Sequence, residues 1–500
     1  MKRAAISTVC VLGGGTAGWM VAAGLAHKLS KLGVSITLIE SDAIGTVGVG
    51  EATLPHIRFF NQSLGIDEAA FMRATKATFK LGIEFRDWGR LGQSYVHPFG
   101  AYGQKREGLD FHHIWLRLRA RGEAGRLDDY SFPVMAAEAM RFQHPAGRPD
   151  EIGSNFGYAY QMDSGLYAAF LRERAEAAGV VRMEGKVADV ALDAETGFVR
   201  SVSLEDGRSV AADLFVDCSG FRGLLIEGAL KTGYEDWRAW LPCDRAFAVQ
   251  CEDAGGPAAP YTRATARPAG WQWRIPLQHR IGNGHVYCSA FTDDEAARAQ
   301  LTDTLEGAAI TEPRQLFFTT GKRRKLWNRN VVAIGLSGGF LEPLESTSIH
   351  LIQEGLSHLL ELFPDTAFEP GDIDEYNRRM DLNFERIRDF LLLHYVATER
   401  EDSEMWRHFR AMTLPDSLAA RIEAWRARGA VAAYEFGVFL PASWVAVMMG
   451  QGLTPEGHDP LADALGEAEA TAFADEVRAA TRAAVERTPE HGAYLRRFVG

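Results

Sequence analysis

A glycine-rich turn near the N-terminus carries the clearest chemical pattern of the chain. Residues 13–18 read GGGTAG, which matches G-x-G-x-x-G, and Glu40 follows at the end of the next expected strand. In this pattern the glycines let the backbone approach a pyrophosphate, the amides of the following helix face the phosphates, and the acidic residue binds a ribose hydroxyl. The pattern predicts a dinucleotide site; a glycine turn with no ligand is the alternative.

Two tryptophans form a second unusual pattern, because residues 271–276 read WQWRIP. In a strand, Trp271 and Trp273 lie on one face, and Pro276 ends the strand because it has no N–H to donate. We therefore expect a wall of two indole rings. The alternative is an aromatic patch in the core, since tryptophan is mostly buried for packing alone.

Two later segments favour FAD over NAD as the dinucleotide. Residues 211–220 read as a strand ending in Asp-Cys-Ser-Gly, and residues 331–339 read as a strand ending in a glycine turn before a helix at 346–360. The amides at such a helix start can face an isoalloxazine ring, on which negative charge builds during reduction.

The elements that position these residues begin with a βαβ unit, made of a strand at 6–12, a helix at 19–32 and a strand at 34–40. Short alternating strands follow, for example at 79–85 and 210–217. From about residue 372 apolar residues recur at helical spacing, which predicts a largely helical region to the C-terminus. The expected fold is α/β with mixed sheets.

Composition restricts the function classes. The chain has 500 residues, 46% of them hydrophobic, and a net charge of −12, so nucleic acid is an improbable partner. Its five cysteines are scattered without a Cys-x-x-Cys pair, which indicates a reducing cytoplasm and no structural metal. The longest apolar stretch, 436–449, contains a proline and is too short to cross a membrane. We expect a soluble cytoplasmic protein.

Over nearly its whole length the chain resembles the flavin-dependent tryptophan halogenase family. The motifs that carry the resemblance are GGGTAG at 13–18, VGEAT at 49–53, Phe79-Lys80, WQWRIP at 271–276 and LEPLEST at 341–347. The resemblance implies a Rossmann-like FAD module of the GR2, aromatic-hydroxylase type. Residues 1–370 would form this module, with the halide site and inserted substrate-binding segments at about 90–150, and the helical region 371–500 would complete the substrate pocket.

In this family reduced FAD reacts with O₂ to give a flavin hydroperoxide, and bound chloride or bromide attacks it. Hypohalous acid then travels through a tunnel to an electron-rich aromatic substrate, and the wall of Trp271 and Trp273 is a plausible barrier between substrate and hydroperoxide. The resemblance implies that FAD is held by Gly13, Gly15, Thr16, Ala17, Gly18, Glu40, Ala52, Val187, Gly335, Leu336 and Ile349.

The resemblance assigns catalysis to Lys80 and Glu345. Lys80 matches the lysine that hydrogen-bonds hypohalous acid or becomes a haloamine; without the motif it would read as a solvated strand lysine. Glu345 would stabilise the cationic arenium intermediate or accept its proton. By itself Glu345 could be an ordinary helix-start acid, although Glu342 is the better candidate for that structural role.

The halide would bind at the same helix start, on the backbone amides of Thr347 and Ser348. Many relatives carry glycine where Ser348 stands, so both chloride and bromide stay open. On the substrate side, His97 and Phe99 match the loop that stacks the indole, and a surface histidine is the alternative at His97. Residues 443–447 contain a single aromatic residue, Trp444, where tryptophan-specific members of the family have tyrosines. Free indole or another electron-rich aromatic is therefore as good a substrate as tryptophan.

Two competing functions share the FAD fold. A single-component aromatic hydroxylase would consume NAD(P)H itself and work without halide, whereas a flavin-binding sensor or redox carrier would turn over no substrate. Neither explains Lys80 or the halide-site residues. No NAD(P)H-binding unit is visible in the sequence, so a separate NAD(P)H-dependent flavin reductase is the expected partner, and a homodimer is compatible with the chain.

Overall fold

The computed structural model describes residues 4–43, 50–147, 151–253, 255–256, 258–434 and 436–500. The chain forms two compact units. The first comprises residues 1–77, 162–244 and 317–385, and the second comprises 78–161, 245–316 and 386–500. The chain thus passes repeatedly from one unit to the other. The functional division predicted at residue 370 stays a prediction, while the region beyond it is mainly helical, as expected.

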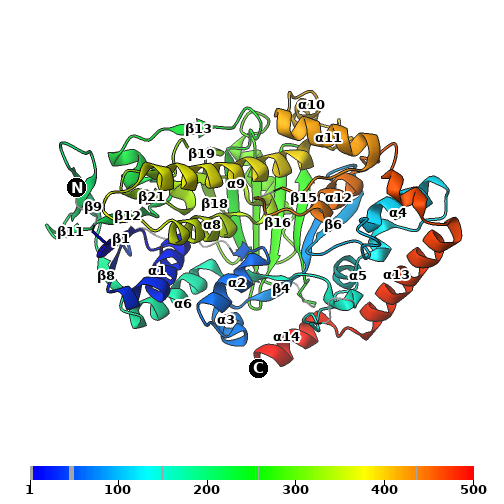
Figure 1. Cartoon of the computed structure of the whole chain (residues 1–500), viewed down its shortest axis with the longest axis horizontal. Coiled ribbons are helices and arrows are strands. Elements are labelled where there is room, and N and C mark those ends of the chain that lie inside the picture. The colour runs from blue at the N-terminus through cyan, green and yellow to red at the C-terminus, as the bar shows by residue number, and fades with distance from the viewer. Residues whose placement is uncertain (1–3, 44–49, 148–150, 254, 257, 435) are drawn as a thin grey trace. The chain divides into compact units, whose positions relative to one another are not determined.

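The first unit contains the predicted βαβ unit. Its six-stranded sheet has the order β20-β21-β12-β1-β2-β8, and β1 pairs in parallel with β2 and β12. Helix α1 connects β1 to β2 and lies beside α8 (Figure 1), where Gly24 leaves room for the side chain of Leu356. The six strands span Thr8–Leu12 (β1), Ser35–Glu40 (β2), Val181–Glu184 (β8), Leu214–Asp217 (β12), Trp327–Asn328 (β20) and Val331–Ala333 (β21).

Two smaller antiparallel sheets and several helices complete the first unit. The sheets are β9 (Val187–Leu192), β10 (Val199–Leu204) and β11 (Ser209–Ala211), and β13 (Tyr234–Asp236), β19 (Gly321–Arg323) and β22 (Gly339–Phe340). The helices are α1 (Thr16–Leu29), α2 (His56–Ser63), α3 (Glu68–Thr75), α6 (Ser164–Ala177), α8 (Ser348–Glu361) and the first part of α9 (Pro370–Val396).

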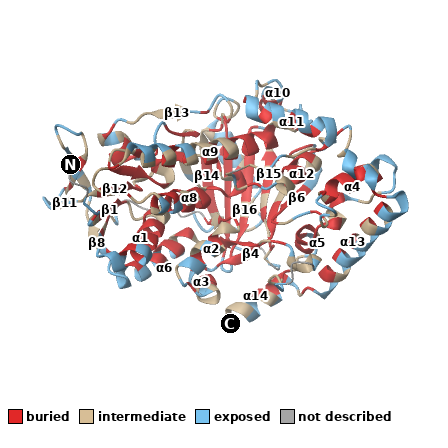
Figure 2. Cartoon of the chain, viewed as in Figure 1, coloured by how far each residue is buried: buried red, intermediate tan, exposed pale blue. Residues whose placement is uncertain are grey.

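The second unit is built on a seven-stranded sheet of order β18-β14-β17-β16-β15-β5-β6. Most of the residues of its central strands are buried (Figure 2). The strands span Gly82–Arg86 (β5), Ser94–Pro98 (β6), Arg245–Cys251 (β14), Thr262–Arg267 (β15), Gly270–Pro276 (β16), Ile281–Tyr287 (β17) and Arg314–Phe317 (β18). A separate antiparallel pair joins β4 (Thr78–Lys80) to β7 (Ala159–Met162).

Helices surround these strands. They are α4 (Phe111–Ala120), α5 (Phe132–Glu138), α7 (Asp294–Asp303), α10 (Glu404–Arg410), α11 (Asp416–Arg428), α12 (Pro441–Gly450), α13 (Glu467–Arg487), α14 (His491–Val499) and the end of α9. No helix within the described residues is long and apolar enough to cross a membrane.

The strand predicted at 79–85 is in fact two strands, β4 and β5, with Leu81 between them. The Leu81 N–H donates to the Pro260 carbonyl at 2.7 Å, and the Phe99 N–H donates to the Leu81 carbonyl at 2.8 Å. The chain leaves the ladder with β7 at this residue and joins the ladder with β15 and β6. Lys80 therefore stands at the end of a short strand.

Candidate active site

The glycine turn of the first unit is shaped as a dinucleotide cradle. Gly13 has φ +115°, and a side chain there would collide with the Cys218 carbonyl; one at Gly18 would collide with the Gly13 carbonyl. At Gly15, by contrast, no described atom lies within 4 Å of the Cβ position, so the backbone there is open. Close packing on one side and an open backbone on the other fit the approach of a pyrophosphate to this turn.

Glu40 lies against the same turn. Its carboxylate accepts a hydrogen bond from the Trp19 indole N–H at 3.3 Å and forms an ion pair with Arg182. A side chain at Gly14 would collide with this carboxylate. The predicted ribose-binding acid is thus held at the cradle by two neighbours of the first unit.

The second glycine turn meets the first one within the same unit. Gly335 has φ +82°, and its Cβ position lies 2.8 Å from the Ala17 Cβ. The buried carboxylate of Asp217, a residue not selected in the sequence analysis, accepts the amides of Leu225 and Ile226 at 2.8 and 2.9 Å. The Asp217 carboxylate thus holds the segment that follows β12.

The remaining predicted flavin residues of the first unit occupy several elements. Leu336 follows Gly335, Ile349 is buried in the first turn of α8, Ala52 ends the short strand β3 (Glu51–Ala52), and Val187 begins β9. Burial raises the pKa of the neighbouring Glu51 to about 7. Val49 of the VGEAT motif lies outside the described residues.

The predicted halide site lies at the start of α8. Ser346 has φ +60°, a left-handed conformation that cannot continue a helix, so α8 begins at Ser348 rather than at the predicted residue 346. The hydroxyl oxygen of Thr347 is buried and has no hydrogen-bond partner among the described residues. An orphaned polar atom beside the free amides of a helix start fits a small ligand such as a halide.

The two glutamates before this helix do not act as helix-start acids. No acidic residue occupies the first turn of α8, and Glu342 instead precedes a short 3-10 turn at Pro343–Glu345. The structural role predicted for Glu342 at the helix start is therefore wrong. Both Glu342 and Glu345 are fully buried.

In the second unit Lys80 is fully buried, at 0% exposure. Its ammonium lies 5.1 Å from the centre of the Phe99 ring, within the range of a cation–π interaction. The alternative of a solvated strand lysine is thereby excluded. Burying an ammonium is costly unless polar or aromatic groups compensate it, so this placement requires a reason.

His97 is also buried, which excludes the surface-histidine alternative. On strand β6, its ring is 6.4 Å from Phe99, 5.5 Å from Phe390 and 6.1 Å from Phe439, measured between ring centres. Phe390 and Phe439 stack at 3.8 Å. These rings and the Lys80 side chain form one aromatic cluster.

Trp444, the third predicted substrate residue, joins this cluster through Phe390, whose ring lies 5.0 Å away. The guanidinium of Arg421 lies 4.4 Å from the Trp444 ring and 4.0 Å from the Tyr434 ring. Phe390, Phe439 and Tyr434 were not selected from the sequence, where Phe390 was only part of an apolar helical run. No local signal distinguishes them, because α9 and the segment before α12 meet only in the folded chain.

Trp271 and Trp273 lie on strand β16, as predicted, and both are buried. Their ring centres are 6.1 Å apart. Small residues make room for them, since Ala266 stands opposite Trp271 and a side chain at Gly284 would collide with the Trp273 ring. Pro276 is the last residue of the strand.

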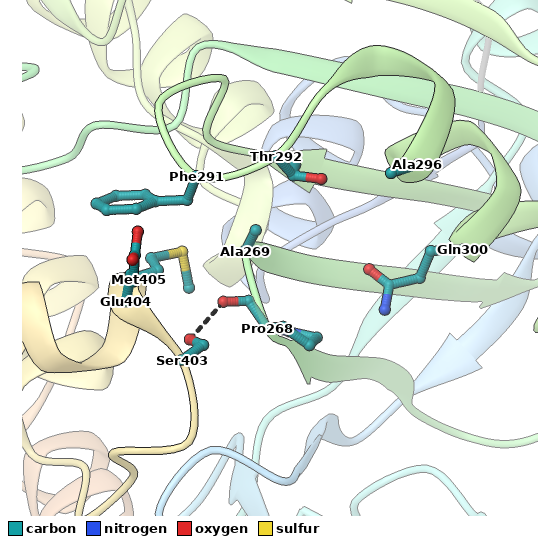
Figure 3. A pocket seen from close by; sticks show the side chains of 9 residues that line it. All are labelled: Pro268, Ala269, Phe291, Thr292, Ala296, Gln300, Ser403, Glu404 and Met405. Carbon is teal, nitrogen blue, oxygen red and sulfur yellow. Dashed lines mark hydrogen bonds between the residues drawn. The ribbon is translucent and has the colours of Figure 1, made fainter.

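Lys80 and the aromatic cluster belong to the second unit, whereas Glu345 and the residues of the halide site belong to the first. The pairing of Lys80 with Glu345 remains a prediction. A cavity of about 290 Å³ in the second unit contains none of the predicted residues (Figure 3). Phe291, Met405 and Gln300 line it, and the Ser403 hydroxyl donates to the Pro268 carbonyl at 2.6 Å.

Comparison with known proteins agrees with this geometry. The tryptophan halogenase family model matches residues 8–467. Tryptophan 6-halogenase SttH of Streptomyces toxytricini is 36% identical over 94% of this chain and 95% of its own length. The flavin-dependent halogenases Xcc4156 of Xanthomonas campestris and BrvH of Brevundimonas sp. BAL3 each superpose with a TM-score of 0.95 at 47% identity, over 99% of both chains. The chain therefore belongs to the tryptophan halogenase family and is a flavin-dependent enzyme that halogenates an aromatic substrate with reduced FAD.

Proposed function

We propose that this halogenase acts on an indole-type aromatic without an amino-acid group, with Lys80 and Glu345 as its catalytic residues and with chloride or bromide bound at the start of α8. The observation that carries the proposal is the fully buried ammonium of Lys80 over the Phe99 ring, inside a cluster of aromatic side chains. Full burial is uncommon for lysine, and here it places the ammonium against an aromatic ring.

The described residues fit FAD. The open backbone at Gly15 and the carboxylate of Glu40 would hold the pyrophosphate and a ribose, and the Gly335 turn lies against Ala17 beside them. Ala52, Val187, Leu336 and Ile349 would complete the contacts. Reduced FAD, supplied by a separate NAD(P)H-dependent reductase, provides the O₂-dependent oxidation of the halide.

The halide is assigned to Thr347 and Ser348. The helix-start amides attract an anion, and the buried Thr347 hydroxyl needs a partner that a halide supplies. No acidic side chain occupies the first turn of α8 itself. Backbone amides can bind either chloride or bromide, so we expect both halides to react.

Lys80 would hold hypohalous acid by donating hydrogen bonds from its ammonium, or would form a haloamine after losing a proton. Glu345 would offset the positive charge of the arenium intermediate and accept the proton that the ring loses. Its complete burial strengthens this electrostatic effect, because little water is present to screen it.

The substrate class rests on the aromatic cluster. His97, Phe99, Phe390, Phe439 and Trp444 offer flat apolar surfaces suited to an indole. Asp389, the residue before Phe390, could bind an ammonium, but it is buried and already accepts from Arg388 at 2.8 Å and from the Ser417 hydroxyl at 2.5 Å. An amino-acid ammonium would have to displace these partners, so a neutral indole is favoured.

Mass spectrometry tests the proposal. Reactions contain the protein, FAD, NADH, a flavin reductase and bromide or chloride, with indole and tryptophan in parallel. We expect a halogen isotope pattern with either halide, stronger on indole, and a loss of at least about 100-fold in product for Lys80→Ala, since a positioned acid–base group contributes about 10²–10⁴ in rate.

The matched control is Lys105→Ala, which removes a lysine whose side chain is 67% exposed. It should retain full activity. Product formation unaffected by Lys80→Ala would refute the role of Lys80. A hydroxylated product formed without halide would support the aromatic hydroxylase instead, and a clear preference for tryptophan would refute the substrate class.

A further inference from the structure

The seven-stranded sheet carries a band of polar residues on the face opposite to the tryptophans. On β16, Gln272 and Arg274 alternate with Trp271 and Trp273 and therefore point to the other face. The strand register places Thr265 opposite Gln272 and Arg263 opposite Arg274. A cavity of about 30 Å³ lies beside these residues, and its lining is formed by Arg263, Thr265, Arg267, Gln272, Arg274 and Asn283 together with Trp273, Leu301, Thr304 and Leu305.

Positive charge exceeds negative charge around this cavity. Arg263 and Arg274 share a single carboxylate, that of Glu306, with the Arg274 Nε at 2.9 Å. Arg267 forms no ion pair with any carboxylate in the described part of the chain, and it donates two hydrogen bonds to the Gln272 side-chain oxygen at 2.8 and 2.6 Å. Three guanidiniums thus face one carboxylate.

One further carboxylate acts on these arginines, because Asp87 favours the charged form of Arg267. Arg86 on the adjacent strand β5 is paired with Glu84 at 3.0 Å. His285 is buried, and burial lowers its pKa to about 4, so it is neutral near pH 7. The Gln272 oxygen already accepts from Thr304 as well as from Arg267. The cavity wall therefore offers arginine donors beside apolar side chains.

The size of the cavity limits the ligand. About 10–15 Å³ is enough to hold one water molecule, so a cavity of about 30 Å³ has room for a monatomic ion. We propose that this cavity binds one halide ion, chloride or bromide, through Arg267, Arg263 and Arg274. This site belongs to the second unit, whereas Thr347 and Ser348 belong to the first.

The ion would stabilise the strand that carries the indole wall. Gln272 and Arg274 flank Trp273 in the sequence, so neutralising the charge beside them strengthens the packing of β16 between β15 and β17. The enzyme that consumes halide would thereby be stabilised by halide. The inference does not rest on the catalytic roles proposed above.

Thermal unfolding of the full chain with saturating oxidised FAD tests the site. Sodium chloride or bromide is titrated against sodium gluconate at constant ionic strength. For the unsubstituted protein we expect a saturable rise in Tm of about 2 °C. Arg267→Gln should lose at least half of the rise, because it removes the unpaired guanidinium. Arg298→Gln, which removes a half-exposed arginine paired with Glu312, should keep all of it.

Two further measurements keep the inference falsifiable if Arg267→Gln folds poorly. Arg267→Lys retains the charge and should show an intermediate rise, and the excess ³⁵Cl NMR line width should fall in the same order as the Tm response. The absence of a halide-specific rise in the unsubstituted protein, or an equal rise in Arg267→Gln, would overturn the inference. A tenfold increase of the halide KM in Arg267→Gln would also overturn it, because the ion would then belong to the catalytic site. Absence of halogenated product leaves the Tm comparison intact.

Discussion

At the scale of single residues, the most informative atoms are buried polar groups that the protein itself does not satisfy. The Thr347 hydroxyl is buried at the start of α8 and has no hydrogen-bond partner in the described residues. Leaving such a group unsatisfied costs about 1–3 kcal/mol, which a ligand can offset. Lys80 is a different case, because its fully buried ammonium lies over the Phe99 ring. Both residues lie where the family motifs predict chemistry.

Thr347→Val separates a halide ligand from a structural threonine. Valine has nearly the same shape and removes the unsatisfied hydroxyl, so Tm should stay the same or rise. If the hydroxyl helps to bind the halide, the halide KM should increase about fivefold or more, corresponding to about 1 kcal/mol. Steady-state kinetics in chloride and bromide measure this change.

Thr320→Val is the matched control, because the Thr320 hydroxyl is likewise buried without a partner among the described residues, ahead of β19. It should leave the halide KM unchanged. A lower Tm together with an unchanged halide KM for Thr347→Val would show that the hydroxyl has a purely structural role.

At the scale of elements, the C-terminal helix α14 supports the strand that ends in Lys80. Phe79, the neighbour of Lys80 on β4, lies 6.0 Å from Tyr494 and 5.6 Å from Phe498 between ring centres. His491 starts this helix, and its Nδ1 donates to the Ala258 carbonyl at 2.6 Å. Burial lowers the pKa of His491 to about 4, so the helix is anchored by a neutral histidine.

The neutral His491 at the start of α14 predicts that the protein becomes less stable in acid. Between about pH 6.5 and 4 the unfolded chain binds a proton at His491 while the folded chain does not, so the free energy of unfolding falls as the pH falls. The contribution is about 3 kcal/mol, because the pKa of His491 falls from 6.5 in the unfolded chain to about 4 in the folded one. His491→Gln should remove this part of the slope in urea unfolding curves recorded across that pH range.

The exposed His27 serves as the control, because His27→Gln should retain the full slope. An unchanged slope in His491→Gln would mean that other groups, such as His285 with its lowered pKa, account for the acid response.

At the scale of the whole molecule, the described part of the chain contains one dinucleotide cradle. Among the described residues, the only parallel strand–turn–helix unit with the G-x-G-x-x-G pattern is the one that begins at β1. The seven-stranded sheet of the second unit is largely antiparallel and offers no equivalent turn. The separate flavin reductase proposed above would supply electrons to the flavin bound there.

We expect the protein with FAD and NADH to oxidise NADH no faster than buffer with FAD, with or without indole. Adding a flavin reductase should start both NADH oxidation and halogenation. Absorbance at 340 nm measures the first reaction. NADH oxidation by the protein alone, stimulated by substrate, would point to a single-component hydroxylase.

The sequence by itself determined the parts of this protein that are local. The dinucleotide turn and the two tryptophans on one strand both lie within short segments, where glycine conformation and strand alternation act between near neighbours. Their interpretation needed no contact between distant residues.

Only the tertiary structure decided whether the chemical residues are buried and which side chains surround them. Strand alternation could not distinguish a solvated Lys80 from a buried one, because both faces of β4 are covered. The cluster of His97, Phe390, Phe439 and Trp444 joins segments more than 290 residues apart in the chain. Such contacts depend on long-range packing of sheet and helices, which no local periodicity encodes.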